Sequence, residues 1–184
     1  MSSVIFFFIW LGFKHILPDG FDHILFILGL FLLNPRLKPV LLQATCFTIA
    51  HTITLILSAK NIIVFDPDIV EPLISLSIVF IAIENIFIKE VKPWRYSIVF
   101  IFGLIHGLGF AGALKDTSID ENTFYSSLIS FNIGVELGQF AVIFLAYFII
   151  GKWYANESWY RKKILYPLSI LIGIIAIYLT LIRI

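Results

Sequence analysis

FYSSLISFNIGVELGQFAVIFLAYFII, residues 124–150, is the stretch of this sequence that decides the fold class. A helix that crosses the hydrocarbon core of a bilayer needs about 20 consecutive, mostly apolar residues. This stretch exceeds that length, and Glu136 is its one charged residue. It therefore predicts a helix that spans a membrane.

Further apolar stretches precede and follow this one. Those long enough to span on their own are Leu37–Ser58, Ile69–Ile88, Ser97–Leu114 and Ile164–Ile184. Two shorter stretches, Val4–Leu17 and Phe21–Leu33, are separated by Pro18-Asp19-Gly20, which is a strong signal for a break between helices. We predict an all-α polytopic membrane helical bundle with seven membrane segments, forming one domain over residues 1–184. The alternative is six spans, with Val4–Leu17 as a short helix in the membrane interface.

The composition argues against the classes of soluble protein. The 184 residues are 60% hydrophobic and 14% charged, whereas an ordinary soluble domain is about 25% charged. A net charge of +1 provides no basic field for nucleic acid, and no phosphate-binding loop motif indicates a nucleotide. Cys46, the one cysteine, excludes an internal disulfide and a zinc cluster built on cysteines. We therefore expect a lipid bilayer around the chain.

Lysine and arginine are distributed unevenly among the loops. The loops after the second, fourth and sixth segments hold nine, and the other three loops hold three. Positively charged loops stay on the cytoplasmic side of a membrane. With seven spans, this predicts a membrane protein with a cytoplasmic N-terminus and an external C-terminus.

Ionisable side chains inside apolar segments are the main functional signal, because such groups are costly at bilayer depth. They are His15, Asp22, His23, His51, Glu84, His106 and Glu136. We find no lysine or arginine deep in a span to neutralise the carboxylates, so they are expected to be protonated or to hold a cation. Histidine together with Asp or Glu suits Zn, Ni, Co or Fe.

Three of these residues surround the turn at Gly20. His15 closes the first segment, and Asp22 and His23 open the second, so the turn brings them together. Asp22 could also serve only as a helix cap and His23 as an interfacial histidine. We favour metal binding for the cluster.

The third and fifth segments each carry one histidine. Thr48 and Thr52 share a helix face with His51, where hydroxyls could orient the ring. His106 stands between glycines, and Gly103 and Gly107 form a GxxxG pattern that allows another helix to approach closely. For both histidines, hydrogen-bonded packing is the alternative to metal binding.

The remaining polar groups fall on the fourth and sixth segments. Asn132, Glu136 and Gln139 follow one stripe, for which we favour a hydrophilic path or site, with Asn132 and Gln139 on the path or supporting the metal ligands, over a structural polar zipper. Gly134 and Gly138 form a second GxxxG pattern on another face. Glu84 is followed by Asn85. A role of Glu84 in an ion path and a structural role, as a protonated glutamate bonded to a neighbouring helix, are about equally favoured.

Several motifs, in this order, resemble the HupE/UreJ-type membrane proteins over about residues 10–147. They are GFKH at 12–15, GFDHILF at 20–26, FTIAHTITL at 47–55, IENI at 83–86, FGLIHGLGFA at 102–111 and FNIGVELGQ at 131–139. The chain is similar to the branch that often carries an extracytoplasmic N-terminal region, and we do not expect that region in this protein. The resemblance implies a bacterial inner-membrane protein linked to nickel or cobalt uptake.

The same resemblance would carry metal-binding roles onto six positions. They are His15, Asp22, His23, His51, His106 and Glu136. The chain departs from the family pattern twice: the step from His15 to Gly20 is one residue longer than the common form, and Thr52 stands where serine is usual.

Two functions compete at this point. The leading hypothesis is a permease for a divalent transition metal, with Ni, Co or Zn as candidates, at an intramembrane His/Asp/Glu site. The alternative is an intramembrane zinc hydrolase acting on a lipid or another amphiphile, since three protein ligands and a water suffice for such a site. A metal sensor or an assembly partner is a third reading.

Overall fold

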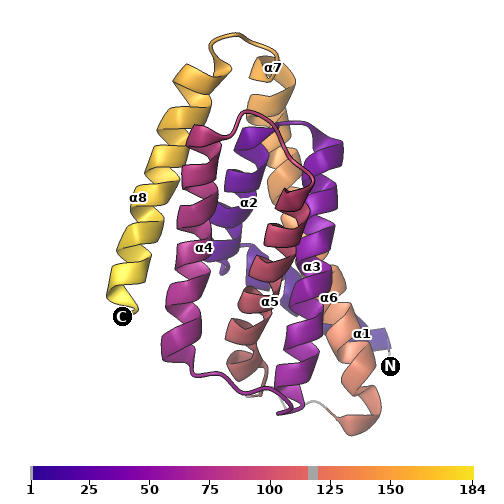
Figure 1. The fold of residues 1–184 in the computed structure, drawn as a ribbon. Helices are drawn as coiled ribbons and strands as arrows, with labels where there is room; N and C mark the ends of the chain where they lie inside the picture. The colour runs from indigo at the N-terminus through magenta and orange to yellow at the C-terminus, as the bar shows by residue number, and fades with distance from the viewer. Residues whose placement is uncertain (1, 116–119) are drawn as a thin grey trace.

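The computed structural model describes residues 2–115 and 120–184, and these residues form helices joined by short connections (Figure 1). The long helices are α1 (Ser2–Ile16), α2 (Phe21–Leu33), α3 (Leu37–Ala59), α4 (Pro67–Phe87), α5 (Trp94–Lys115), α6 (Phe124–Ala146) and α8 (Tyr166–Ile182). Shorter pieces are η1 (Glu121–Thr123), η2 (Tyr147–Gly151), α7 (Lys152–Tyr154) and η3 (Arg161–Leu165). The prediction of an all-α polytopic membrane bundle is confirmed.

The helices differ in their capacity to cross a bilayer. Those long and apolar enough on their own are α3, α4, the continuous stretch Glu121–Tyr154 and the stretch Arg161–Ile182. The apolar part of α5, Trp94–Phe110, is shorter. Helices α1 and α2 pass the test only together, and a bend of 69° separates them. The seven predicted segments are therefore seven helices, of which four are candidate spans on their own, or five when the bent pair is counted as one span.

The bend between α1 and α2 follows from Pro18 and Gly20. Proline has no backbone N–H and disfavours helix at the residue before it, so α1 ends at Ile16. The chain then folds back so tightly that a Cβ atom at Gly20 would collide with the carbonyl oxygen of His15. Glycine is required here by space, and the resulting turn holds the end of α1 against the start of α2.

Small residues also set the closest helix contacts. Gly103 and Gly107 bring α5 against the backbone of α3, where a Cβ at Gly107 would collide with the carbonyl oxygen of His51. Gly134 brings α6 against the backbone of α1 at Ile9 in the same way, and Gly138 makes room for the side chain of Ile16. Helix α1 is thus packed onto a neighbouring span, which differs from a helix lying free in the membrane interface.

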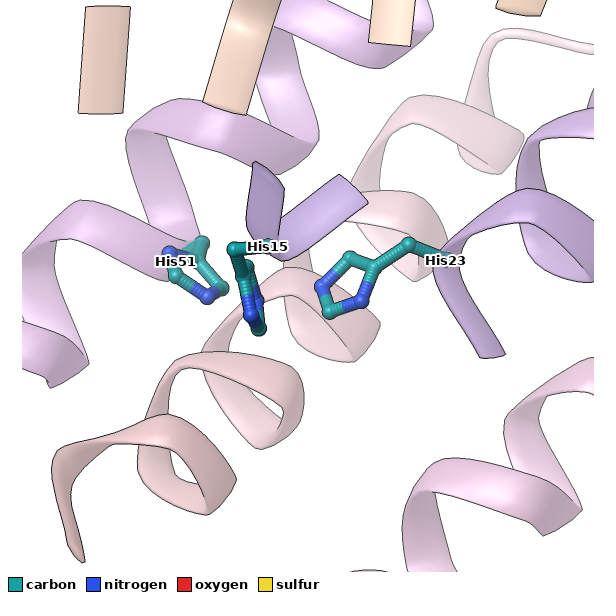
Figure 2. A group of neighbouring side chains, drawn as sticks. All are labelled: His15, His23 and His51. Carbon is teal, nitrogen blue, oxygen red and sulfur yellow. The ribbon is translucent and has the colours of Figure 1, made fainter. Parts of the chain in front are cut away.

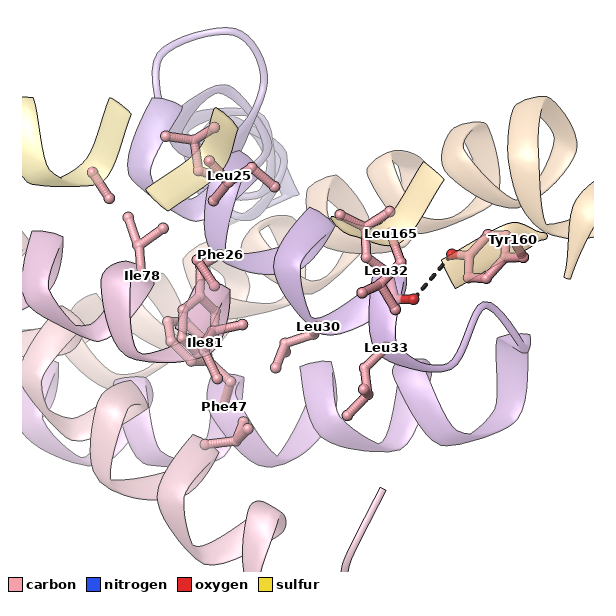
Figure 3. Packing of buried hydrophobic residues seen from close by; sticks show 14 residues of the cluster. Leu25, Phe26, Leu30, Leu32, Leu33, Phe47, Ile78, Ile81, Tyr160 and Leu165 are labelled. Carbon is pink, nitrogen blue, oxygen red and sulfur yellow. Dashed lines mark hydrogen bonds between the residues drawn. The ribbon is translucent and has the colours of Figure 1, made fainter. Parts of the chain in front are cut away.

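Helix α2 lies in the interior of the bundle. Most of its side chains are buried, and one core cluster gathers Leu25, Phe26 and Leu30 of α2 with Ile78 and Ile81 of α4 (Figure 3). At the end of α2, the buried Tyr160 hydroxyl donates a hydrogen bond of 2.9 Å to the carbonyl oxygen of Leu32. This bond ties the connection before α8 to the core.

The two ends of the bundle differ in the connections they carry. The connections α2–α3, α4–α5 and α7–α8 lie at one end, the upper one in Figure 1, and hold most of the loop lysines and arginines. The α3–α4 connection lies at the lower end, and both termini are in the lower half of the view. We call these the basic end and the opposite end.

Candidate metal centre

The four histidines of the chain converge where α1 meets α2. His15 lies in the last turn of α1, His23 in the first turn of α2, His51 in α3 and His106 in α5. The ring centroid of His23 is 4.7 Å from that of His15, 5.9 Å from that of His51 and 5.0 Å from that of His106. Four separate helices therefore contribute imidazoles to one place inside the bundle.

His15, His23 and His51 form the tightest part of this group, which we call the histidine trio. One ring nitrogen from each lies within 4.8 Å of the others, and Figure 2 shows the three rings side by side. Two nitrogens bound to one ion, each about 2 Å from it, lie within about 4 Å of each other. The spacing in the trio is close to this limit, so the three nitrogens would have to draw slightly together to hold a single ion.

The free nitrogens of the histidines also fit a cation. Among the described residues, Nε2 of His15, His23 and His51 and Nδ1 of His106 are buried and have no hydrogen-bond partner. A buried polar atom left in this state costs about 1–3 kcal/mol. An ion bound by these lone pairs would remove that cost, so the donor set suits a transition metal.

Two polar side chains orient the rings through their other nitrogens. Nδ1 of His51 is 3.3 Å from Oδ1 of Asn132, and Nε2 of His106 is 3.0 Å from Oγ of Ser77. Such partners set the tautomer and the direction of a metal-binding imidazole. Asn132 was predicted as part of a path, whereas Ser77 was missed as a site residue, although a hydroxyl in an apolar span was a usable signal.

A cavity of about 260 Å³ connects this region to the surface away from the basic end. His15, His23 and His106 line it together with Asp22, Glu71 and Arg183. Glu71 and Asp19 at its rim are exposed. The histidines are therefore reachable from one side of the bundle.

A family model described as HupE / UreJ protein matches residues 1–183. The chain belongs to the HupE/UreJ family. This family is associated with the uptake of nickel and cobalt. No curated protein and no solved structure matches the chain.

In this HupE/UreJ protein, Asp22 is paired with an arginine. The guanidinium of Arg183 donates to both carboxylate oxygens of Asp22, at 3.1 and 2.8 Å. The expectation that no arginine neutralises the intramembrane carboxylates is therefore wrong for Asp22. Arg183 follows α8 and lies 161 positions away in the sequence, so nothing local could indicate the pair.

Glu84 also has a cationic partner. The guanidinium of Arg95, at the start of α5, lies 3.1 Å from its carboxylate, and both side chains are buried. Asn85 accepts from Arg95 at 3.4 Å and donates to the carbonyl oxygen of Gly29 and to Ser169 at 2.8 and 3.2 Å. Glu84 and Asn85 thus join α2, α4, α5 and α8 near the basic end, which favours the structural reading over an ion path.

Glu136 is hydrogen-bonded to α3. It is one turn beyond Asn132 on α6 and accepts a hydrogen bond of 2.6 Å from Thr45 of α3. Gln139 accepts one of 3.3 Å from Thr48. The polar stripe of α6 therefore faces α3, and only Asn132 reaches a histidine directly.

The two threonines beside His51 do not bond to its ring among the described residues. Thr48 donates to the carbonyl oxygen of Ala44 at 3.1 Å, and Thr52 donates to that of Thr48 at 2.7 Å. Hydroxyls in apolar helices commonly return to the carbonyl four residues earlier, since it is the nearest acceptor. The orienting role expected of these hydroxyls is filled by Asn132 instead.

Proposed function

We propose that this HupE/UreJ protein is a permease for a divalent transition metal of the nickel or cobalt type. The observation that carries the proposal is the histidine trio: one ring nitrogen of each residue lies within 4.8 Å of the others, and each ring also has a buried Nε2 without a hydrogen-bond partner among the described residues. His106 adjoins the trio and offers a further nitrogen. The metal is the transported substrate in this proposal.

A polar seam between α3 and α6 supports movement beyond the histidines. It consists of the pairs His51–Asn132, Thr48–Gln139 and Thr45–Glu136, which follow one another along α3 toward the basic end. Several weak oxygen and nitrogen sites in sequence let an ion enter and leave a pathway.

The proposed orientation places the basic end in the cytoplasm of a bacterial inner membrane, because positively charged loops stay inside. The cavity at the histidines then opens outward, and the seam leads inward. If the bent α1–α2 pair is one broken span, both termini lie on the outer side. The N-terminus would then be external, in contrast to the cytoplasmic position expected from seven spans.

An intramembrane zinc hydrolase is the second candidate. The observation that favours it is the set of three imidazoles beside an open cavity. Three protein ligands with an open position are typical of catalytic zinc sites. A hydrolase would not need the seam between α3 and α6, so substitution of Glu136 separates the two candidates.

Uptake into proteoliposomes tests the permease. We expect the full chain to carry Ni²⁺ or Co²⁺ to a metal-sensitive dye inside the vesicles, and we expect His51→Ala to abolish saturable uptake. Glu136→Gln should lower uptake while leaving Ni²⁺ binding in place. Ser169→Ala, which removes a buried hydroxyl of α8 that bonds to Asn85 near the basic end, is the matched control. Folded His51→Ala protein with wild-type uptake would contradict the proposal.

A further inference from the structure

Arg183 occupies the mouth of the cavity that leads to the histidines. Besides its two bonds to Asp22, its Nη1 donates to Oγ of Ser75 at 2.5 Å, and its Nε lies 3.6 Å from the carboxylate of Glu71. One guanidinium thus contacts two carboxylates and a hydroxyl, which belong to α2 and α4. These oxygen groups already act together as a binding site for a cation, and the cation is a side chain of the protein.

The same cavity wall carries nitrogen atoms that lack a partner. His23 and His106 line the cavity with Asp22, Glu71 and Arg183, and each buries one ring nitrogen without a hydrogen bond among the described residues. Both histidines are more than nine-tenths buried. A cation that reaches them through this cavity passes the arginine and its two carboxylates.

We propose that Arg183 is a built-in competitor of the metal, which holds Asp22 and Glu71 as an outer cation site until an arriving divalent cation displaces its guanidinium. This inference rests on the proposed function, because it concerns access of the metal to the histidines. In this proposal the arriving ion first contacts Asp22, Glu71 and Ser75, and it reaches the histidine trio afterwards.

Charge and exposure support an exchange at this position. Asp22, Glu71 and Arg183 sum to one negative charge, so the mouth attracts cations even while the arginine is bound. A divalent ion carries twice the charge of the guanidinium and can replace it on the two carboxylates. The side chains of Arg183 and Asp22 are each 21% exposed, so the displaced guanidinium can reach water.

The test is the affinity of the full chain for Ni²⁺ in detergent, measured by titration calorimetry. Arg183→Gln should bind Ni²⁺ at least about fivefold more tightly than wild type, since a coupled competitor is removed. Arg183→Lys keeps a positive charge and should fall between the two. Asp22→Asn in the Arg183→Gln background should cancel the gain. Arg36→Gln, an exposed arginine at the basic end, is the matched control.

Ser75→Ala is the second variant, for use if Arg183→Gln fails to fold. It removes one bond to the guanidinium and leaves both carboxylates, so it should raise the affinity in the same direction by a smaller factor. Unchanged or weaker binding in these folded variants, with binding that still depends on His51, overturns this inference alone. Binding of Ni²⁺ that does not depend on His51 in wild type overturns the proposed function instead.

Discussion

Two of the carboxylate–arginine pairs among the described residues, Glu84–Arg95 and Asp22–Arg183, differ in exposure. Glu84 and Arg95 are 4% and 0% exposed, near the basic end, whereas Asp22 and Arg183 are each 21% exposed at the cavity mouth. A buried pair is costly to break, because either partner left alone is an uncompensated charge in a medium of low dielectric constant. A partly exposed pair can separate, because water reaches both partners. The first pair is therefore suited to holding helices together and the second to exchange.

Breaking the buried pair should give the largest effect. We expect Arg95→Met to lower the free energy of unfolding by about 3–5 kcal/mol, because it leaves Glu84 buried without its cation. Replacing both partners, as Glu84→Leu with Arg95→Met, should recover most of that loss. Thermal unfolding in detergent, followed by circular dichroism, measures both variants. An Arg95→Met protein as stable as wild type would remove the structural role of this pair.

The second prediction compares two buried serines: Ser77, beside the histidines, and Ser169, near the basic end. Ser77→Ala should weaken Ni²⁺ binding by about 10-fold, because the loss of a partner that orients a metal-binding histidine typically has this size. Ser169→Ala is the control, since Ser169 bonds to Asn85 near the basic end and contacts no histidine by a hydrogen bond among the described residues. Equal effects of the two substitutions on affinity would contradict the assignment of Ser77.

The smallest expected effect is the change in the free energy of unfolding when the partly exposed pair Asp22–Arg183 is broken. Arg183→Gln should change the free energy of unfolding by less than about 1 kcal/mol, as is usual for ion pairs in contact with water. The measurement is the same thermal unfolding used for Arg95→Met. A loss as large as the one expected for Arg95→Met would show that Arg183 is a structural anchor, and the contrast between the two pairs would fail.

The sequence determined the properties that depend on neighbours along the chain. Hydropathy is such a property, and residues 124–150 alone indicated a spanning helix. The cost of an ionisable group in an apolar segment is also local, so the histidines could be singled out without any structure. Pro18 and Gly20 likewise placed the break between α1 and α2, because backbone restrictions act within a few residues.

Only the tertiary structure decided which of these groups meet. Asp22 and Arg183 are 161 positions apart, and His51 meets Asn132 across 81 positions, so their pairing depends on which helices pack together and at what rotation. The apolar faces of these helices are too similar to specify that packing in advance. Asp22, which the sequence predicted as a metal ligand, therefore bonds to an arginine, and Ser77 bonds to a histidine. Side chains this far apart in the sequence pair only where the folded chain brings them into contact.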